Sequence, residues 1–225
     1  TWVSDQQDLI EILHLGRSDW NYISNTHLEE MNLYLFIYGD TLSYQSIYTS
    51  SATDSKIEYT DRYDLKIIQA SDFMMVVKPV SDLSKKFFQN RPVLTFKNKK
   101  YLIDKSLVFE KLVYHASQAW DGPTVALEVD SNKVLYMKYQ NNSYGPDRGL
   151  ATGNYSATLG DTTYSQLIAY LQNCNLRKLR FGNIRGNDSP EIRLIVYYNG
   201  KRKFLKSMFP PRLAEELLSF IVWRL

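Results

Sequence analysis

The sequence contains one cysteine, Cys174, among its 225 residues. The chain therefore has no pair of cysteines for an internal disulfide and no cysteine cluster for a metal ion. Cys174 follows a predicted helix that contains Leu171, and a small buried thiol is the ordinary explanation for such a position. Long apolar runs are missing too, since Leu33–Tyr38 and Phe73–Val77 are far shorter than the roughly 20 residues of a membrane-spanning helix. The sequence predicts neither a disulfide framework nor a membrane span.

Common catalytic motifs are also missing from the sequence. It has no glycine-rich phosphate loop, no G-x-S-x-G turn, no H-E-x-x-H pair and no EF-hand spacing. The three histidines, His14, His27 and His115, are scattered along the chain, and a metal site would need all of them to converge. We therefore expect no metal and no cofactor, and we favour binding over catalysis without excluding an enzyme.

The residues that are plentiful favour strands. Hydrophobic residues make up 44% of the chain, and 17 residues are tyrosines, which suit half-buried pleated surfaces. The net charge of +3 is too small to imply a polyanionic partner. The segment 175–206 is more basic, with nine basic and two acidic residues. Such a patch attracts phosphate or acidic surfaces in some proteins, but solvated strand faces explain it equally well, and we expect no nucleic-acid partner.

The first half predicts a β-rich domain, residues 1–106, with one leading helix. Ser4 is a plausible N-cap, and Leu9, Ile10 and Leu13 would line one face of a helix that ends at Gly16. Alternating apolar residues from position 33 onward, followed by Gly39-Asp40, then predict a hairpin.

The second half, residues 107–225, predicts an α+β domain. Hairpins are expected at Thr124–Tyr139 and Ile192–Lys206, the second turning at Asn199-Gly200. Helices are expected at Asp161–Gln172 and Pro211–Trp223, covering one face of the sheet. The fold class predicted for the whole chain is α+β with mostly antiparallel sheets, and the second half runs strand-strand-(strand)-helix-strand-strand-helix.

A family resemblance in the second half rests on the order of several short segments: Phe109-Glu110-Lys111-Leu112, Gly122-Pro123, Leu127-Glu128-Val129-Asp130, Gly153-Asn154-Tyr155, Asn173-Cys174-Asn175-Leu176, Tyr198-Asn199-Gly200-Lys201-Arg202-Lys203 and Met208-Phe209-Pro210-Pro211. In this order residues 109–225 resemble an uncharacterised domain, of unknown function, that is common in envelope proteins of Bacteroidetes-type bacteria. Members of that family usually carry a cysteine pair before the second strand. Here that stretch is 117–123, which has no cysteine. The resemblance implies a fold and a habitat but no activity.

The most promising binding surface in the sequence is a pair of loops. Trp120 and Asp121 precede one predicted strand of the second half, while Tyr144 and Arg148 lie in the loop that leaves the sheet. Loops that carry an aromatic ring, a carboxylate and an arginine on a rigid scaffold are common binding sites. We predict ligand binding by these four residues, although Trp120 would serve equally well as a core residue.

The alternative to a binding module is a hydrolase with an unrecognised carboxylate site, because glycosidase chemistry needs two carboxyl groups that flank one bond. Candidate carboxylates are Glu29 and Glu30, Glu128 and Asp130, and Asp161. Asp130 abuts a predicted turn, and Asp161 is expected to cap a helix.

Partners and location are expectations drawn from these observations together. We expect a protein, glycan or small-molecule ligand. The chain begins at Thr1 without a methionine. With the family resemblance, this favours a periplasmic protein, or one anchored to a membrane by a lipid on an upstream segment that has been removed.

Overall fold

The computed structural model describes residues 1–117, 123–141, 151–182, 186 and 189–225. The chain divides into two compact units, Thr1–Leu102 and Ile103–Leu225, and each is described by itself. None of the helices in the described residues is both long enough and apolar enough to span a bilayer.

The predicted α+β class is wrong for the chain. Strands account for 48% of the residues and helices for 18%, so the protein is mostly β. The first unit is a closed eight-stranded antiparallel barrel, and the second is built on a six-stranded antiparallel sheet. Two segments of the second half do have helical periodicity, but helices account for too few residues to make α+β the class of the whole chain.

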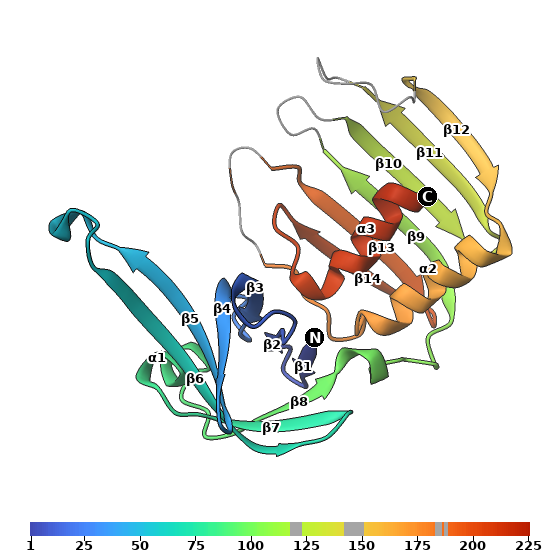
Figure 1. The fold of residues 1–225 in the computed structure, drawn as a ribbon. Coiled ribbons are helices and arrows are strands. Elements are labelled where there is room, and N and C mark those ends of the chain that lie inside the picture. Colours follow the sequence, from blue (N-terminus) through green and yellow to red (C-terminus); the bar gives the residue numbers. More distant parts are fainter. Residues whose placement is uncertain (118–122, 142–150, 183–185, 187–188) are drawn as a thin grey trace. The chain divides into compact units, whose positions relative to one another are not determined.

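The strands of the barrel follow one another in chain order (Figure 1). They are β1 (Trp2–Ser4), β2 (Leu9–Ile10), β3 (Gly16–Ser24), β4 (Glu30–Tyr38), β5 (Thr41–Thr49), β6 (Glu58–Ala70), β7 (Met74–Pro79) and β8 (Leu94–Asn98). The barrel closes where β1 pairs with β8, with Trp2 opposite Asn98 and Ser4 opposite Phe96. The predicted hairpin after position 33 is confirmed as β4 and β5, with Tyr38 opposite Thr41.

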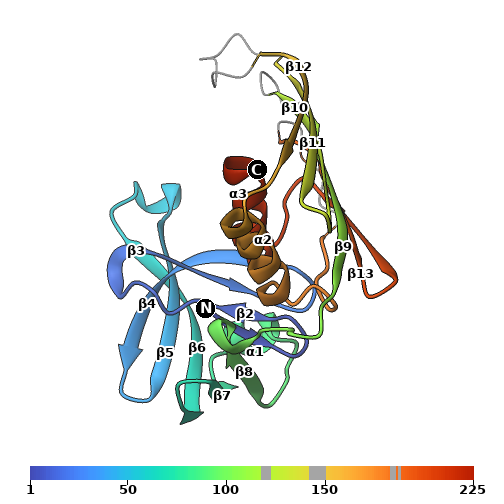
Figure 2. The same cartoon turned by 90° about the vertical axis from the view of Figure 1, so that its right-hand side faces the viewer.

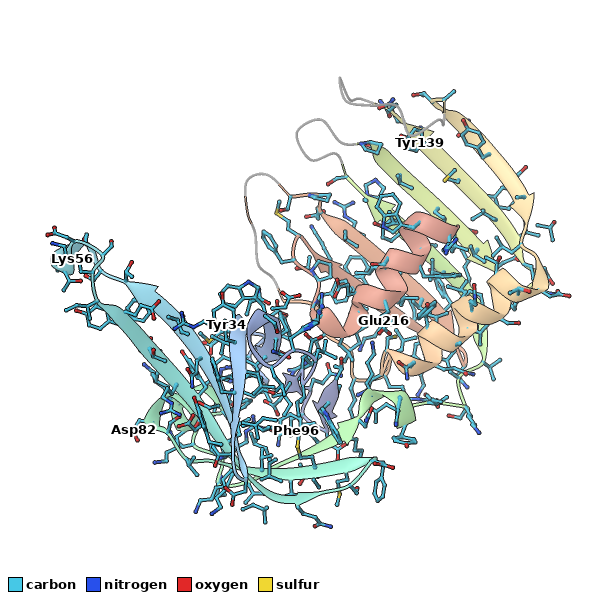
Figure 3. All side chains as sticks on the ribbon, in the orientation of Figure 1. Tyr34, Lys56, Asp82, Phe96, Tyr139 and Glu216 are labelled. Atoms are coloured by element: carbon cyan, nitrogen blue, oxygen red, sulfur yellow. The ribbon has the colours of Figure 1, made fainter. Side chains whose placement is uncertain are left out.

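Apolar side chains fill the inside of the barrel. Because successive strand residues point to opposite faces, Leu33 and Leu35 of β4 point inward together with Leu42 and Tyr44 of β5, and Phe96 of β8 is completely buried among them (Figure 3). Burying each large apolar side chain contributes about 1.5–3 kcal/mol. The interior is therefore a packed core.

The predicted leading helix is wrong. Its residues form β1, a turn and β2, and the predicted end at Gly16 is the first residue of β3. Ser4 does satisfy local backbone groups, since its Oγ accepts hydrogen bonds from the N–H groups of Gln6 (3.2 Å) and Asp8 (3.0 Å). It does so in a turn, where Gln7 has a positive φ of 73°. Serine side chains stabilise such turns and helix starts through the same kind of bond.

A short helix, α1 (Asp82–Phe87), lies between β7 and β8. Ser81 caps it, because its Oγ accepts a hydrogen bond from the backbone N–H of Ser84 at 3.3 Å. Gln89 and Asn90 follow with φ of 58° and 56°, and such left-handed residues end a helix. Phe87 at the end of α1 is buried in the core of the barrel.

The second unit is a sheet with the strand order β12-β11-β10-β9-β13-β14. Its elements are β9 (Phe109–Ala116), β10 (Thr124–Asp130), β11 (Val134–Gln140), β12 (Gly153–Thr158), α2 (Asp161–Asn173), β13 (Ile192–Tyr198), β14 (Lys201–Ser207) and α3 (Glu215–Arg224). Short 3-10 turns occupy Ser51–Thr53 and Lys99–Tyr101 in the first unit and Arg212–Ala214 in the second. Both predicted hairpins are confirmed, as β10 with β11 and as β13 with β14.

Helices α2 and α3 lie on the same side of this sheet (Figure 2). Leu167 and Leu171 of α2 are buried, as are Leu217 and Ile221 of α3. The covered face of the sheet supplies the matching apolar residues: Leu112, Tyr114, Leu127, Val129, Leu194 and Val196. The alternate residues of the same strands form the other face of the sheet, which is called the open face below.

Candidate functional site

The loop site predicted from the sequence lies outside the described residues. This applies to all four of its members, Trp120, Asp121, Tyr144 and Arg148. Their contribution to binding stays a prediction.

Three of the carboxylates considered for hydrolysis, Glu128, Asp130 and Asp161, have other partners. Asp130 accepts hydrogen bonds from the backbone N–H groups of Asn132 and Val134, both at 2.9 Å, in the β10–β11 turn. Glu128, beside it on the open face, pairs with Lys111. The prediction that Asp161 caps a helix is wrong, because Gly160 is the N-cap of α2 and the Asp161 carboxylate lies 2.6 Å from Lys133 Nζ.

The basic segment is partly neutralised. Arg177 lies 2.6 Å from Asp104, while Arg193 and Lys206 both pair with Glu191, at 2.6 and 2.8 Å. Within the described ranges, no three or more His, Cys, Asp or Glu residues lie together as a metal site would require.

The candidate site is instead a pocket at one end of the barrel. It has a volume of about 410 Å³, which falls in the range of small-molecule sites. It lies between the β3–β4 turn, β6 and α1, and its lining residues are His27, Glu29, Met31, Tyr63, Leu83, Lys86, Phe87 and Gln89. All of them belong to the first unit.

The floor and sides of the pocket are apolar. Phe87 is almost completely buried, and its ring meets that of Tyr63 edge to face, with 5.9 Å between the ring centroids. Met31 and Leu83 are half-buried beside them. Burial raises the pKa of the Tyr63 hydroxyl, and the nearby negative charge of Asp61 raises it further. Tyr63 therefore presents a neutral hydroxyl, which both donates and accepts hydrogen bonds.

The rim of the pocket carries ionisable groups of both signs. His27 and Glu29 come from the β3–β4 turn, and Lys86 comes from the last turn of α1. All three residues are exposed. Across the described residues, neither Glu29 nor Lys86 forms an ion pair, although the two line one pocket.

Asn25 holds the two walls of the pocket together. It is fully buried, and its Nδ2 donates to the backbone carbonyl oxygen of Phe87 at 2.9 Å and to Glu29 Oε2 at 2.6 Å. Its Oδ1 accepts hydrogen bonds from the backbone N–H groups of His27 (2.9 Å) and Glu29 (3.2 Å). These bonds fix the turn, in which Leu28 has a φ of 63°, against the end of α1.

A second contact supports the same junction. Thr26 Oγ1 donates to Gln89 Oε1 at 2.8 Å. The other end of that amide, Gln89 Nε2, is buried and has no hydrogen-bond partner in the described part of the chain. A buried unpartnered donor costs about 1–3 kcal/mol, so a ligand or water that reached it would lower the free energy of the bound state.

Sequence reasoning missed this pocket. In the sequence, Glu29 stands out only as one of two adjacent carboxylates, and His27 only as one of three scattered histidines. The pocket depends on contacts between residues about 60 positions apart, such as Asn25 and Phe87. The one local indication was Asn25 itself, since asparagine favours turns through bonds of this kind.

The open face of the second unit carries a shallower hollow of about 320 Å³, whose lining includes Val113, Ala126, Glu128, Tyr136 and Lys138. Ala126 has the smallest side chain among them, and it lies opposite Lys138 in the β10–β11 pairing. Glu128 is engaged by Lys111. The carboxylate of this hollow is therefore already paired, whereas no described cation pairs with Glu29 of the barrel pocket.

Comparison with protein-family models, with curated proteins and with solved structures finds no match to this chain. The site is therefore assessed on its own geometry.

Proposed function

We propose that the protein is a non-enzymatic binding module of the bacterial cell envelope and that it binds a small amphipathic ligand in the barrel pocket. The observation that carries the binding function is the pocket itself, in which an apolar floor is combined with a charged rim of Glu29 and Lys86. An apolar cavity with a small number of convergent polar groups is typical of small-molecule sites. The envelope location rests on the sequence resemblance of residues 109–225.

Rigidity supports binding as the role of the pocket. The walls are tied by the side chain of Asn25, which is fully buried, and by Thr26 with Gln89. A preformed pocket loses little conformational entropy when a ligand enters, so more of the contact energy appears as affinity.

The alternative, a carboxylate hydrolase, finds less support in the pocket. Among its described lining residues Glu29 is the one carboxylate, whereas glycosidase chemistry uses two. Steady turnover of a glycoside or ester by the purified chain, lost on Glu29→Gln, would support the hydrolase and overturn the proposal.

Blocking the pocket tests the binding function. Leu83 lines the pocket and is half-buried, so Leu83→Trp should fill the space. Lys85→Trp is the matched control, because Lys85 is exposed on the same helix and does not line the pocket. In a ligand-observed NMR screen of small amphipathic compounds, the wild type and the control should share bound compounds that the blocked variant loses. Equal binding by all three chains contradicts the proposal.

Location has its own test. An antibody to this chain should detect it in the envelope fraction of the source cell. Recovery in the cytosolic fraction would refute that part of the proposal.

A further inference from the structure

The charges on the rim of the barrel pocket are of opposite sign and do not neutralise each other. Within the described structure, neither Lys86 nor Glu29 forms an ion pair, with each other or with any other residue. Asn25 engages one carboxylate oxygen of Glu29, Oε2, and no described donor reaches the other. Lys86 Nζ likewise has no described acceptor. The pocket thus offers a carboxylate with one unengaged oxygen and an unpaired ammonium group above one apolar floor.

We infer that the ligand of this pocket is a small zwitterion with an apolar body, of the amino-acid class. This deepens the proposed function and depends on it. The ligand's ammonium group would pair with Glu29, its carboxylate would pair with Lys86, and its apolar body would lie against Phe87 and Leu83. A ligand of one charge would meet a like charge on one side of the rim, and like charges disfavour binding.

The surroundings of the two charges fit this assignment. Asn25 holds Glu29 through Oε2 at 2.6 Å, so the position of the carboxylate is set before a ligand arrives. Lys86 lies in the last turn of α1, one residue before the buried Phe87, so its backbone is equally fixed. The floor is wide enough for a branched aliphatic or aromatic side chain, given a pocket of about 410 Å³.

The experiment uses the full chain and four related probes: leucine, N-acetyl-leucine without the ammonium, leucinamide without the carboxylate, and N-acetyl-leucinamide without either. Affinities are measured by NMR titration at low salt. Leucine should bind best, and each missing charge should weaken binding by about two- to fivefold, as expected for exposed charge pairs. Added salt should reduce the differences, because it screens charges at the rim.

Variants assign each charge to its partner. Glu29→Gln keeps an oxygen that can accept the bond from Asn25, and it should remove the effect of the ligand's ammonium while leaving the effect of its carboxylate. Lys86→Met keeps the aliphatic stem, and it should remove the effect of the ligand's carboxylate while leaving the effect of its ammonium. Lys85→Met is the control, since Lys85 pairs with Asp82 at 3.4 Å and is not in the pocket. It should leave all four affinities unchanged.

The outcomes separate this inference from the proposed function. If all four probes bind equally and Leu83→Trp abolishes their binding, the pocket binds ligands but the zwitterion assignment is wrong. If none of the probes binds, the assignment is likewise wrong, and the compound screen then decides the proposed function. If Glu29→Gln and Lys86→Met weaken every probe alike, the charges act on the pocket structure and the assignment fails. Leucyl-glycine, whose charges lie further apart, distinguishes a free amino acid from a short peptide.

Discussion

Asn25 donates an amide hydrogen to the backbone carbonyl oxygen of Phe87 at 2.9 Å, and this bond joins the β3–β4 turn to the end of α1. The same side chain bonds the turn through three further contacts, to Glu29 Oε2 and to the N–H groups of His27 and Glu29. A residue that is completely buried and makes four hydrogen bonds organises both walls of the pocket.

Asn25→Ala should therefore destabilise the barrel and open the pocket. It leaves the Phe87 carbonyl and the turn N–H groups without partners, at a cost of about 2–4 kcal/mol in unfolding free energy. Urea denaturation measures the loss. Asn32→Ala, at an exposed position on β4, is the control and should change little. Equal stability of the two variants would show that Asn25 has no such role.

A buried ion pair joins the segment before β2 to the segment after α1. Asp8 is fully buried, and Arg91 binds both of its carboxylate oxygens, with 2.7 Å between Nη1 and Oδ2. Arg91→Met should cost about 3–5 kcal/mol, because it leaves a buried charge without its partner.

Hydrogen exchange of the barrel amides measures the loss of stability in Arg91→Met. Lys97→Met is the matched control, since it removes an exposed pair with Asp5 (3.4 Å) that contributes at most about 1 kcal/mol. Similar exchange rates in the two variants would contradict the structural role of the buried pair.

Local patterns predicted several elements of this fold correctly. The β13–β14 hairpin was predicted from Asn199-Gly200, and these residues do have the positive φ angles of a tight turn. The apolar spacing of Leu9, Ile10 and Leu13 predicts a helix over residues 4–16. Leu13 is 53% exposed in the structure, whereas Leu9 and Ile10 are both buried. Adjacent buried residues also occur on the apolar face of an amphipathic helix, so the local pattern did not distinguish the two structures, and tertiary packing decided the outcome.

Closure of the barrel could not be predicted from local patterns. It depends on pairing between Trp2 and Asn98, which are separated by almost the whole unit. The pocket has the same origin, because it appears only where the turn at Asn25 meets Phe87. Residue periodicity reports which face of a strand is buried, but it does not report which distant strand lies beside it.

Glu30, the first residue of β4, makes stability depend on pH. Burial raises its carboxyl pKa, and the neighbouring Tyr22 opposes part of that rise. A carboxyl whose pKa is raised on folding contributes stability below its unfolded pKa, and that contribution is lost as pH rises through the folded pKa. Glu30→Gln should therefore raise Tm at pH 7, and the gain should disappear near pH 4.

Glu58 is the control for this prediction, because Arg17 lowers its pKa through a hydrogen bond and charge attraction. Glu58→Gln should give no gain in Tm at pH 7. Thermal melts of the three chains between pH 4 and pH 8 test the prediction. A gain from Glu30→Gln that persists unchanged at pH 4 would show that ionisation of Glu30 is not its cause.

Asn199 and Gly200 connect β13 to β14, with φ of 51° and 68°. A two-residue turn with two positive φ angles matches the twist of the strands that it joins. Gly200→Ala should cost about 1 kcal/mol, because a side chain disfavours this backbone conformation. Asn199 also ties the turn to the start of β9, since its Oδ1 accepts from Val108 N–H (3.1 Å) and its Nδ2 donates to the Ser106 carbonyl (2.9 Å).

Two substitutions at Asn199 separate the contribution of the backbone conformation from that of the side-chain hydrogen bonds. Asn199→Gly keeps the positive φ and loses the two side-chain bonds, so it should cost about 1 kcal/mol. Asn199→Ala loses the bonds and adds backbone strain, so it should cost about 2 kcal/mol. Hydrogen exchange of amides in β9, β13 and β14 gives the local opening free energy of each variant. If Asn199→Gly had the same local opening free energy as the wild type, the side chain of Asn199 would contribute nothing to stability. The turn would then depend on its backbone conformation alone.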